Sequence, residues 1–467
     1  MTEAQTAPDP SERPVRDAEG GIDPALLARI EHSLEREDVA DLRDVVEDMH
    51  EADLGAVLEA LEHDQRVALI SLLGADFDFT ALTEVDDAVR EDILEALPVE
   101  TVAEGVRDLD TDDAVYILED LDEADKRDVL DRLPAAERIA LQQGLDYPED
   151  SAGRRMQTEI LAVPSFWTVG QTIDHLRLSD SLPERFFEIL VADPAHHFVG
   201  SVPLDRLLRT KRPVEIATLV DEDSRAVRDT DDIEDVARQF QRYNLISTPV
   251  VDHAGRLVGV VTVDDIVDVI EDAADDDAKQ LGGVDADEEL SDPVAKIARG
   301  RFRWLFVNLL TSFLAAWVMS LFEAQIQKLV ALAILSPIVA SQGGNATTQT
   351  MTVAVRALAT QQLGAWNLRR FLTREIIVGI LNGIGFAIIT GIVAWLWFHD
   401  PRLGVVIGIA MIVNLLAAAL AGVLIPLGLD RAGVDPAISS GTFTTTVTDV
   451  VGFFAFLGFA TVFLHLA

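Results

Sequence analysis

The sequence predicts a multi-domain membrane protein with an all-α N-terminal domain, a mixed α/β domain, a connecting helix and a transmembrane domain of five helices. Two observations carry this prediction. Residues 1–303 of the 467 hold essentially all of the formal net charge of −43, whereas the chain from Trp304 onward is almost entirely apolar. Near residue 147 the hydrophobic pattern changes from a helical period to short alternating runs.

Residues 1–22 are rich in Pro, Glu, Asp and Gly without an apolar period, which predicts a disordered acidic tail. The start is polar, so we expect no signal peptide. The 80 acidic residues outnumber 37 basic ones, of which only five are lysines. Such a surface is typical of proteins in concentrated salt, and we expect a salt-loving source organism. Its sign disfavours nucleic-acid partners, and the absence of cysteine excludes thiolate chemistry.

Residues 23–146 predict a helical domain. Short amphipathic runs at 54–61, 102–109 and 114–121 alternate with breaks such as Asp110-Thr-Asp-Asp113 and Leu133-Pro134. Aspartate and threonine at these breaks are good N-cap residues. We therefore expect a small array of helices.

Residues 147–272 predict two copies of one α/β unit. In the second copy, strands at 247–252 and 257–261 follow a helix over 230–240, and Thr262-Val-Asp-Asp265 caps another helix. A weaker first copy has strands at 188–193 and 198–202, then a helix at 204–208. This duplication resembles a tandem pair of cystathionine-β-synthase (CBS) domains.

Residues 273–303 form a connector, much of which we expect to be one helix. The transmembrane domain follows over 304–467, with apolar segments at 304–322, 328–355, 374–398, 404–429 and 442–466. Each segment is long enough to span a core of about 30 Å. Arginines before the first segment and between the second and third place those loops inside by the positive-inside rule. We expect a multi-pass plasma-membrane protein with cytoplasmic N-terminal domains and an extracellular C-terminus.

Two of the membrane segments carry polar groups. Asp449 is the only acid between Gly441 and Ala467, and an acid at membrane depth commonly faces a cavity or ion path. The alternative is a structural acid satisfied by the neighbouring threonine hydroxyls. The second segment combines Pro337 with glycines, amides and hydroxyls over 341–349, which predicts a broken helix beside a wet cavity.

These residues together resemble the MgtE-type family of magnesium channels and transporters. The matching stretches are Tyr147–Gly153, Val263–Asp268, Gly343-Gly-Asn345 with Gln349, Arg356–Thr360, Glu375 with Val378-Gly379, Asp435-Pro-Ala437 and Thr448–Gly452. The resemblance implies a homodimer in a lipid bilayer, with a pore on the two-fold axis and Asp449 as its ion-binding carboxylate. It also implies closure of the pore by a connecting "plug" helix when Mg²⁺ binds the cytosolic domains.

The resemblance assigns further residues. Sensor acids fall on Asp112, Asp265, Asp268 and Asp276, and the pore lining on Gly343, Gly344, Asn345, Thr348, Gln349, Thr448 and Gly452. Thr262 and Asp265 match a CBS motif for adenine nucleotides such as ATP, so Asp265 is a candidate for either ribose or metal. The chain departs from the family at Tyr116, Asn244 and Ala273, where sensor acids can stand, and at Thr347 and Thr348 in the pore.

We therefore expect a channel that imports Mg²⁺ down its electrochemical gradient. One Asp per chain, doubled by symmetry, suits an ion that keeps most of its waters. A carrier coupled to Na⁺ or H⁺, a channel for Mn²⁺, Co²⁺ or Ca²⁺, and a membrane-anchored sensor without transport are the alternatives. A CBS pair that serves only as a dimer scaffold is another. No Gly-rich phosphate loop is present, and we expect no enzymatic activity.

Overall fold

The computed structural model describes residues 15–465 except 18, 19, 48, 180, 181, 184, 222, 223, 287, 365 and 435. The chain forms two compact units, Met1–Glu271 and Asp272–Ala467. Most of the predicted acidic tail, and Asp435 of the Asp-Pro-Ala motif, lie outside the described residues.

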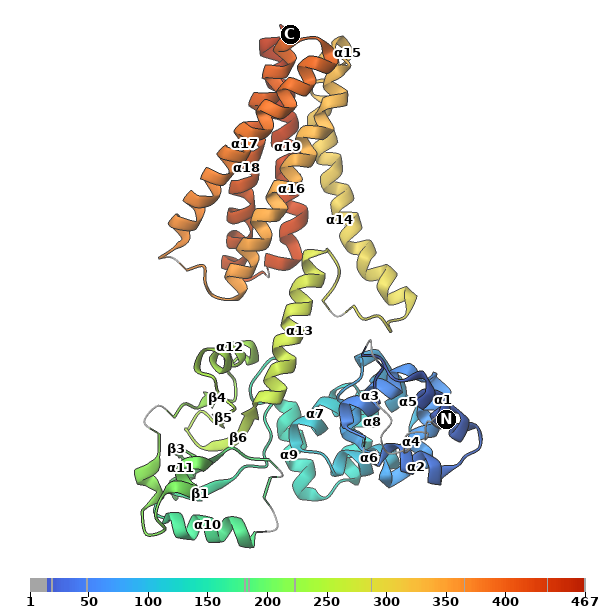
Figure 1. Cartoon of the computed structure of the whole chain (residues 1–467), viewed down its shortest axis with the longest axis vertical. Coiled ribbons are helices and arrows are strands. Elements are labelled where there is room, and N and C mark those ends of the chain that lie inside the picture. Colours follow the sequence, from blue (N-terminus) through green and yellow to red (C-terminus); the bar gives the residue numbers. More distant parts are fainter. Residues whose placement is uncertain are drawn as a thin grey trace, which may run out of the picture. The chain divides into compact units, whose positions relative to one another are not determined.

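The first half of unit 1 is an all-helical domain (Figure 1). Aspartate side chains accept backbone N–H bonds at the start of several helices, as Asp122 does from Ala124 and Asp125. Leucine, valine and isoleucine on the inner faces form one continuous core. The helices are α1 (Pro24–Glu35), α2 (Val39–Val46), α3 (Glu51–Ala60), α4 (His63–Leu73), α5 (Asp87–Ala96), α6 (Val99–Arg107), α7 (Thr111–Glu119), α8 (Glu123–Arg132) and α9 (Ala135–Asp146), with short 3₁₀ turns η2 (Gly74–Asp76) and η3 (Phe79–Leu82).

The second half of unit 1 contains two three-stranded sheets of identical topology, which confirms the predicted duplication. In each sheet the first strand pairs parallel to the second, and the second pairs antiparallel to the third. The first copy contains β1 (Ala162–Pro164), α10 (Val169–Leu178), β2 (Glu188–Ala192), β3 (Phe198–Pro203), α11 (Leu204–Arg209) and η4 (Ile216–Leu219). The second contains β4 (Val227–Arg228), α12 (Ile233–Tyr243), β5 (Ser247–Val251), β6 (Leu257–Thr262) and the start of α13 (Val263–Leu281).

The connector is two helices, so the prediction of one helix over much of 273–303 is wrong. α13 ends at Leu281 because Gly283 adopts a φ of +77°, and the Val284 N–H then donates to the Lys279 carbonyl over 3.1 Å. α14 begins at Val294, directly after Pro293. The connector is therefore divided because Gly283 ends the first helix and Pro293 precedes the second.

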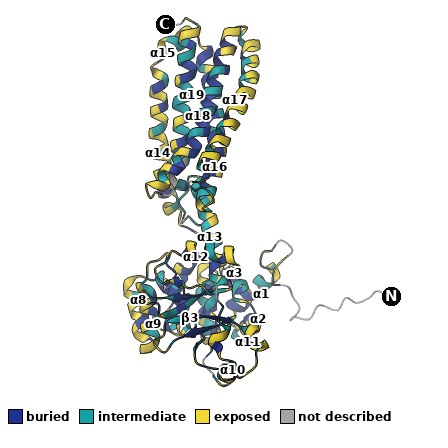
Figure 2. Ribbon diagram, turned by 90° about the vertical axis from the view of Figure 1, so that its left-hand side faces the viewer, coloured by how far each residue is buried: buried dark blue, intermediate teal, exposed yellow. Residues whose placement is uncertain are grey.

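Unit 2 is a bundle built around α18, which is mostly buried, whereas α14 and α17 are largely exposed (Figure 2). Gly391 and Gly404 let α17 and α18 approach closely, since a Cβ on Gly404 would lie 2.5 Å from the Gly391 carbonyl oxygen. The helices are α14 (Val294–Ser320), α15 (Glu323–Lys328), α16 (Ala331–Ala359), α17 (Leu368–Phe398), α18 (Pro401–Arg431) and α19 (Pro436–Phe463).

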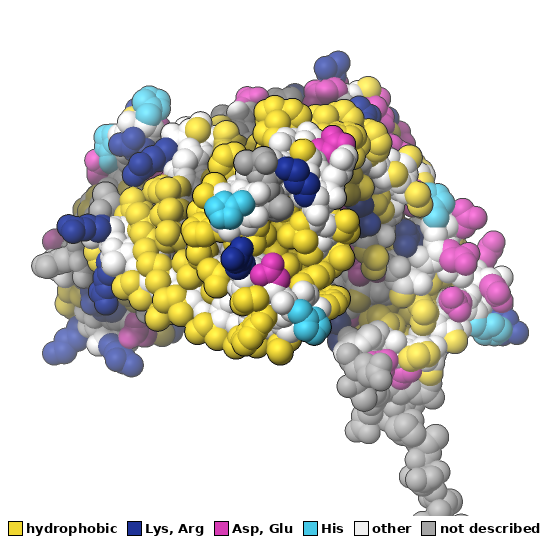
Figure 3. Space-filling model, turned by 90° about the horizontal axis from the view of Figure 1, so that it is seen from above, with side chains coloured by type: hydrophobic (Ala, Val, Ile, Leu, Met, Phe, Trp, Pro, Cys, Tyr) yellow, Lys and Arg dark blue, Asp and Glu magenta, His cyan; other side chains and the backbone are white. Residues whose placement is uncertain are grey.

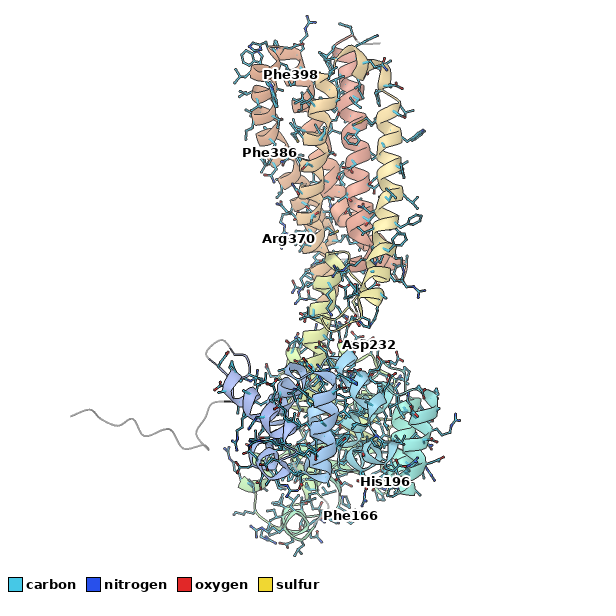
Figure 4. All side chains as sticks on the ribbon, turned by 90° about the vertical axis from the view of Figure 1, so that its right-hand side faces the viewer. Phe166, His196, Asp232, Arg370, Phe386 and Phe398 are labelled. Carbon is cyan, nitrogen blue, oxygen red and sulfur yellow. The ribbon has the colours of Figure 1, made fainter. Side chains whose placement is uncertain are left out.

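Four of the described helices are long and apolar enough to cross a membrane: α14, α17, α18 and Gly441–Phe463 of α19. Hydrophobic side chains cover much of the bundle surface seen from above (Figure 3). Along α17, Arg370 lies near the first turn, whereas Phe386 and Phe398 follow toward the other end (Figure 4). α16 has 29 residues but is not among the four helices, because Ser, Gln, Asn and Thr side chains lower its hydropathy.

The second apolar segment is an unbroken helix, which corrects the prediction of a break. α16 continues through Pro337 and through Gly343-Gly344. Tertiary packing holds the helix together, with Leu335, Val339 and Ala340 buried against the bundle. The glycines serve close approach between helices, as described below for Gly343.

Candidate ion pathway and cation-sensing site

Asp449 lies on α19, one turn after Thr445 and half-buried in the chain. The threonines around it donate to carbonyls of their own helix: Thr445 to Gly441 over 2.9 Å and Thr448 to Thr445 over 2.9 Å. Within the described part of the chain, no hydrogen bond or ion pair of the Asp449 carboxylate is found. The structural alternative, an acid satisfied by neighbouring hydroxyls, is therefore not the arrangement seen.

α16 packs against α19, the helix that carries Asp449. A Cβ on Gly344 would be 4.0 Å from the Thr445 methyl carbon, so the two helices touch one turn before Asp449. Asn345, Thr348 and Gln349 of α16 are exposed in the single chain. Amide and hydroxyl oxygens on the exposed face of α16 can accept hydrogen bonds from the waters of a hydrated cation.

Three predicted pore-lining residues are instead enclosed by helix packing. Gly343, Thr448 and Gly452 are buried. Both glycines contact Asn414 of α18: a Cβ would lie 2.2 Å from its Nδ2 at Gly343 and 2.8 Å at Gly452. The two glycines determine how α16, α18 and α19 pack, because only glycine leaves room for the Asn414 amide.

Sequence reasoning missed Asn414. Its side chain is fully buried, and its Nδ2 donates to the Val339 carbonyl of α16 over 2.8 Å. Its Oδ1 has no hydrogen-bond partner among the described residues. A polar residue in the otherwise apolar run 403–427 was the available signal, but it gave no indication that two glycines would face it.

The end of α13 packs on the start of the bundle. Leu281 contacts a small core of Met351 and Val355 on α16 and Ala437 on α19. Beside it, Arg356 Nη1 lies 3.6 Å from Asp277 Oδ2. The helix that carries part of the predicted sensor therefore contacts the two helices that carry the predicted pore residues.

In unit 1, Asp112 and Asp113 of α7 lie near Asp265 at the start of α13, and we call these three residues the acidic cluster. Asp112 is buried, and burial together with the charge of Asp265 raises its pKa well above the ordinary value. Burial and Asp265 raise the pKa of Asp113 to about 7. Sequence reasoning named Asp112 and missed Asp113, its neighbour in the same acidic turn.

The surroundings of Asp265 have opposite effects on its pKa. Burial raises its pKa to about 7, while a hydrogen bond from the Thr262 hydroxyl at 2.8 Å and the charge of Arg155 lower it. Arg155 also lies 4.6 Å from the ring centroid of Tyr116, which Arg90 covers at 4.2 Å. The Arg155 guanidinium therefore lies against Tyr116, one of the positions at which the sequence departs from the expected sensor acids.

The remaining predicted sensor acids lie further along α13. Asp268 is exposed in unit 1, and Asp276 is half-buried in unit 2. Across the described part of the chain, no three Asp, Glu or His side chains are placed to hold one metal ion. The acidic cluster does supply carboxylate oxygens, the type of ligand that Mg²⁺ prefers, although the three side chains do not surround one ion position.

Thr262 and Asp265, the predicted nucleotide contacts, are brought together at the junction of β6 and α13 by their 2.8 Å hydrogen bond. The first copy has Pro203 and Arg206 in these places. Arg206 donates to the Leu219 carbonyl over 3.0 Å. The two copies therefore share a fold but differ in the chemistry of this junction.

Family models match three parts of the chain. They describe a divalent cation transporter, MgtE, over residues 336–459, the MgtE intracellular N domain over 49–150 and a CBS domain over 216–272. The magnesium transporter MgtE of Enterococcus faecalis is 34% identical over 70% of this chain and 72% of its own length. That of Thermus thermophilus is 31% identical over 94% of this chain and 99% of its own.

Among solved structures, the chain is similar to the cytosolic domain of the Mg²⁺ channel MgtE in complex with ATP. The identity is 30% and the TM-score 0.49, and the match covers 52% of this chain and 99% of that one.

Proposed function

Because the chain belongs to the MgtE family of magnesium transporters, we propose that it is a homodimeric channel importing Mg²⁺ through a pore that contains Asp449 of both subunits. The observation that carries this proposal is the Asp449 carboxylate, half-buried on a membrane-length helix without a partner in the described part of its own chain. A charge at that depth needs water, a cation or a second subunit.

The pore is formed by α19 and the exposed face of α16. Asn345, Thr348 and Gln349 line it with Asp449, while Gly343, Thr448 and Gly452 pack behind them. Two carboxylates related by symmetry hold Mg²⁺ with most of its waters, as the reluctance of this ion to dehydrate requires. α16 is the fifth span, and its polar side chains are tolerated because they face the pore.

Cytosolic Mg²⁺ closes the channel by binding the acidic cluster. Bound cation cancels the repulsion among Asp112, Asp113 and Asp265 and holds α7 against the start of α13. The far end of α13 packs through Leu281 on the two pore helices, and this contact passes the change to the pore. We include Asp268 and Asp276 of α13 in the same proposal, as further acids that bind cytosolic Mg²⁺.

The orientation places residues 1–303 in the cytoplasm and the C-terminus outside, supported by the basic loops and by the match to an intracellular N domain. An adenine nucleotide binds the second CBS copy through Thr262 and Asp265, supported by their placement at one strand–helix junction. Nucleotide and Mg²⁺ would then share Asp265.

Asp449→Asn tests the pore. The variant in liposomes is expected to lose at least about tenfold of its Mg²⁺ flux, since a neutral amide removes the charge that attracts the ion. Asp430→Asn, the same change at an exposed residue on α18, is the control and should retain wild-type flux. Wild-type flux through Asp449→Asn would remove this residue from the pore. Flux that needs an opposing Na⁺ or H⁺ gradient would indicate a coupled carrier.

A further inference from the structure

A pocket of about 850 Å³ lies in unit 2 between the turn after α13 and the first turns of α14. Its wall includes three cationic side chains, Lys296, Arg299 and Arg303, and one acid, Asp285. Trp304 and Gln280 complete the polar part of the wall. The pocket is positive in a chain that has 80 acidic and 37 basic residues.

Most charges around this pocket are already paired. Lys296 Nζ lies 2.7 Å from Asp292, Arg301 pairs with Glu288, and Asp285 accepts the Trp304 indole N–H over 2.9 Å. By contrast, neither Arg299 nor Arg303 has a hydrogen bond or ion pair within the described residues. They are four residues apart on one helix, so their guanidinium groups lie on the same face and both reach the pocket.

The position on α14 indicates the kind of ligand. Directly beyond Arg303 the helix exposes large apolar side chains, with Leu305 at 65% and Phe313 at 64% exposure. Trp304 lies between the basic start of α14 and its apolar part. Tryptophan is enriched at such positions because it favours the membrane–water interface. If α14 spans the bilayer, the pocket lies at the level of the lipid headgroups.

We propose that this pocket binds the phosphate headgroup of an anionic membrane lipid, with Arg299 and Arg303 as the phosphate ligands. The guanidinium fork matches two phosphate oxygens, and a pair of forks satisfies a phosphodiester without further protein charge. Lipid tails then lie along the exposed apolar face of α14. The proposal goes beyond transport and requires only that α14 lies in the membrane.

The test uses the full-length chain purified in detergent, with bound lipids counted by native mass spectrometry. Phosphatidylglycerol is expected to bind with higher affinity than phosphatidylcholine. Arg299→Gln with Arg303→Gln should lower phosphatidylglycerol affinity at least about fivefold. The double lysine variant keeps the charge but loses the guanidinium fork, so its affinity should lie between those of the glutamine variant and the wild type. Arg369→Gln with Arg370→Gln is the control for equal loss of charge, since both are exposed arginines on α17 outside the pocket.

Three results would overturn the proposal. The first is unchanged phosphatidylglycerol binding by the glutamine variant, and the second is an equal loss in the α17 control, which would indicate general surface charge. The third is binding of phosphatidylglycerol that is no tighter than that of inorganic phosphate, which would identify a soluble anion as the occupant. None of these readouts uses Mg²⁺ flux, so failure here is separate from failure of the proposed channel.

Discussion

The burial of Asn414 and the pKa values of the buried acids depend on the residues packed around them. Asn414 is tolerated in an apolar bundle because Gly343 and Gly452 make room for it and the Val339 carbonyl accepts its N–H. The three acids of the acidic cluster are ordinary carboxyls whose pKa values are raised mainly by burial, with a smaller contribution from neighbouring carboxylates.

Gly343→Ala and Gly452→Ala test the fit around Asn414. Each added methyl meets the amide at 2.2 and 2.8 Å, so each variant should lose about 1–3 kcal/mol of stability, measured by thermal unfolding in detergent. Asn414→Ala should restore part of this loss in a double variant. Gly458→Ala on α19 is the control, since a Cβ there meets nothing within 4 Å. Equal destabilisation by Gly458→Ala would show a general effect of glycine replacement.

The acidic cluster predicts a pH dependence. An acid whose pKa is raised by the contact stabilises that contact while protonated, and the stabilisation is lost as pH rises from about 4 through about 7. Without Mg²⁺, proteolysis between α7 and α13 should therefore increase from pH 5.5 to pH 8, and Mg²⁺ should suppress the increase.

Asp113→Asn should flatten this pH dependence, because it removes one of the groups that titrates near 7. Asp128→Asn, at an exposed site on α8, should leave it unchanged. A pH profile in Asp113→Asn identical to that of the wild type would contradict the assignment of the titration to the cluster.

Among the secondary-structure elements, α13 has the widest set of contacts that bear on function. It begins at the hydrogen-bonded pair Thr262 and Asp265, the proposed nucleotide and sensor site, and it ends against α16 and α19 through Leu281. Its length is set by Gly283, whose positive φ allows the bonds that end the helix. The ion pair of Arg356 and Asp277 adds less, because the Arg356 side chain is exposed to screening water.

Leu281→Ala should therefore weaken closure of the channel by Mg²⁺. Losing most of this apolar contact is expected to raise the Mg²⁺ concentration that inhibits flux by roughly five- to tenfold. Arg356→Gln should shift it less. Leu290→Ala provides the matched control, since Leu290 is 99% exposed in the same connector. If the Leu290 and Leu281 variants behave alike, the contact with α16 and α19 does not transmit closure.

The molecule as a whole is divided by charge. Residues 1–303 hold nearly all of the net charge of −43, and the bundle that follows is close to neutral. Mutual repulsion among so many carboxylates acts over a distance that salt shortens, to about 3 Å at 1 M. The prediction that this surface is adapted to concentrated salt rests on that screening.

Lowering NaCl from 2 M to 0.1 M at fixed Mg²⁺ should lower the thermal unfolding midpoint of unit 1, since repulsion destabilises the compact state. Adding sucrose at low salt should restore less stability than NaCl, because sucrose does not screen charge. A midpoint independent of NaCl would contradict the proposed adaptation to salt.

The sequence alone determined the order of domains, the duplicated α/β unit, the family and the single acid of the last helix. Composition, hydrophobic period and short motifs are local properties, and each can be read within a few tens of residues. The helix stop at Gly283 was equally local and could have been found, since the Gly-Gly pair is visible in the sequence.

Only the tertiary structure decided which polar residues are enclosed and which remain exposed. It showed α16 to be continuous through Pro337, placed Gly343 and Gly452 against Asn414, and brought Asp113 near Asp265 across 152 positions of sequence. Such outcomes depend on packing between segments far apart in the chain, where a contact is fixed by the fit of both partners. A pattern within one segment contains no information about the partner.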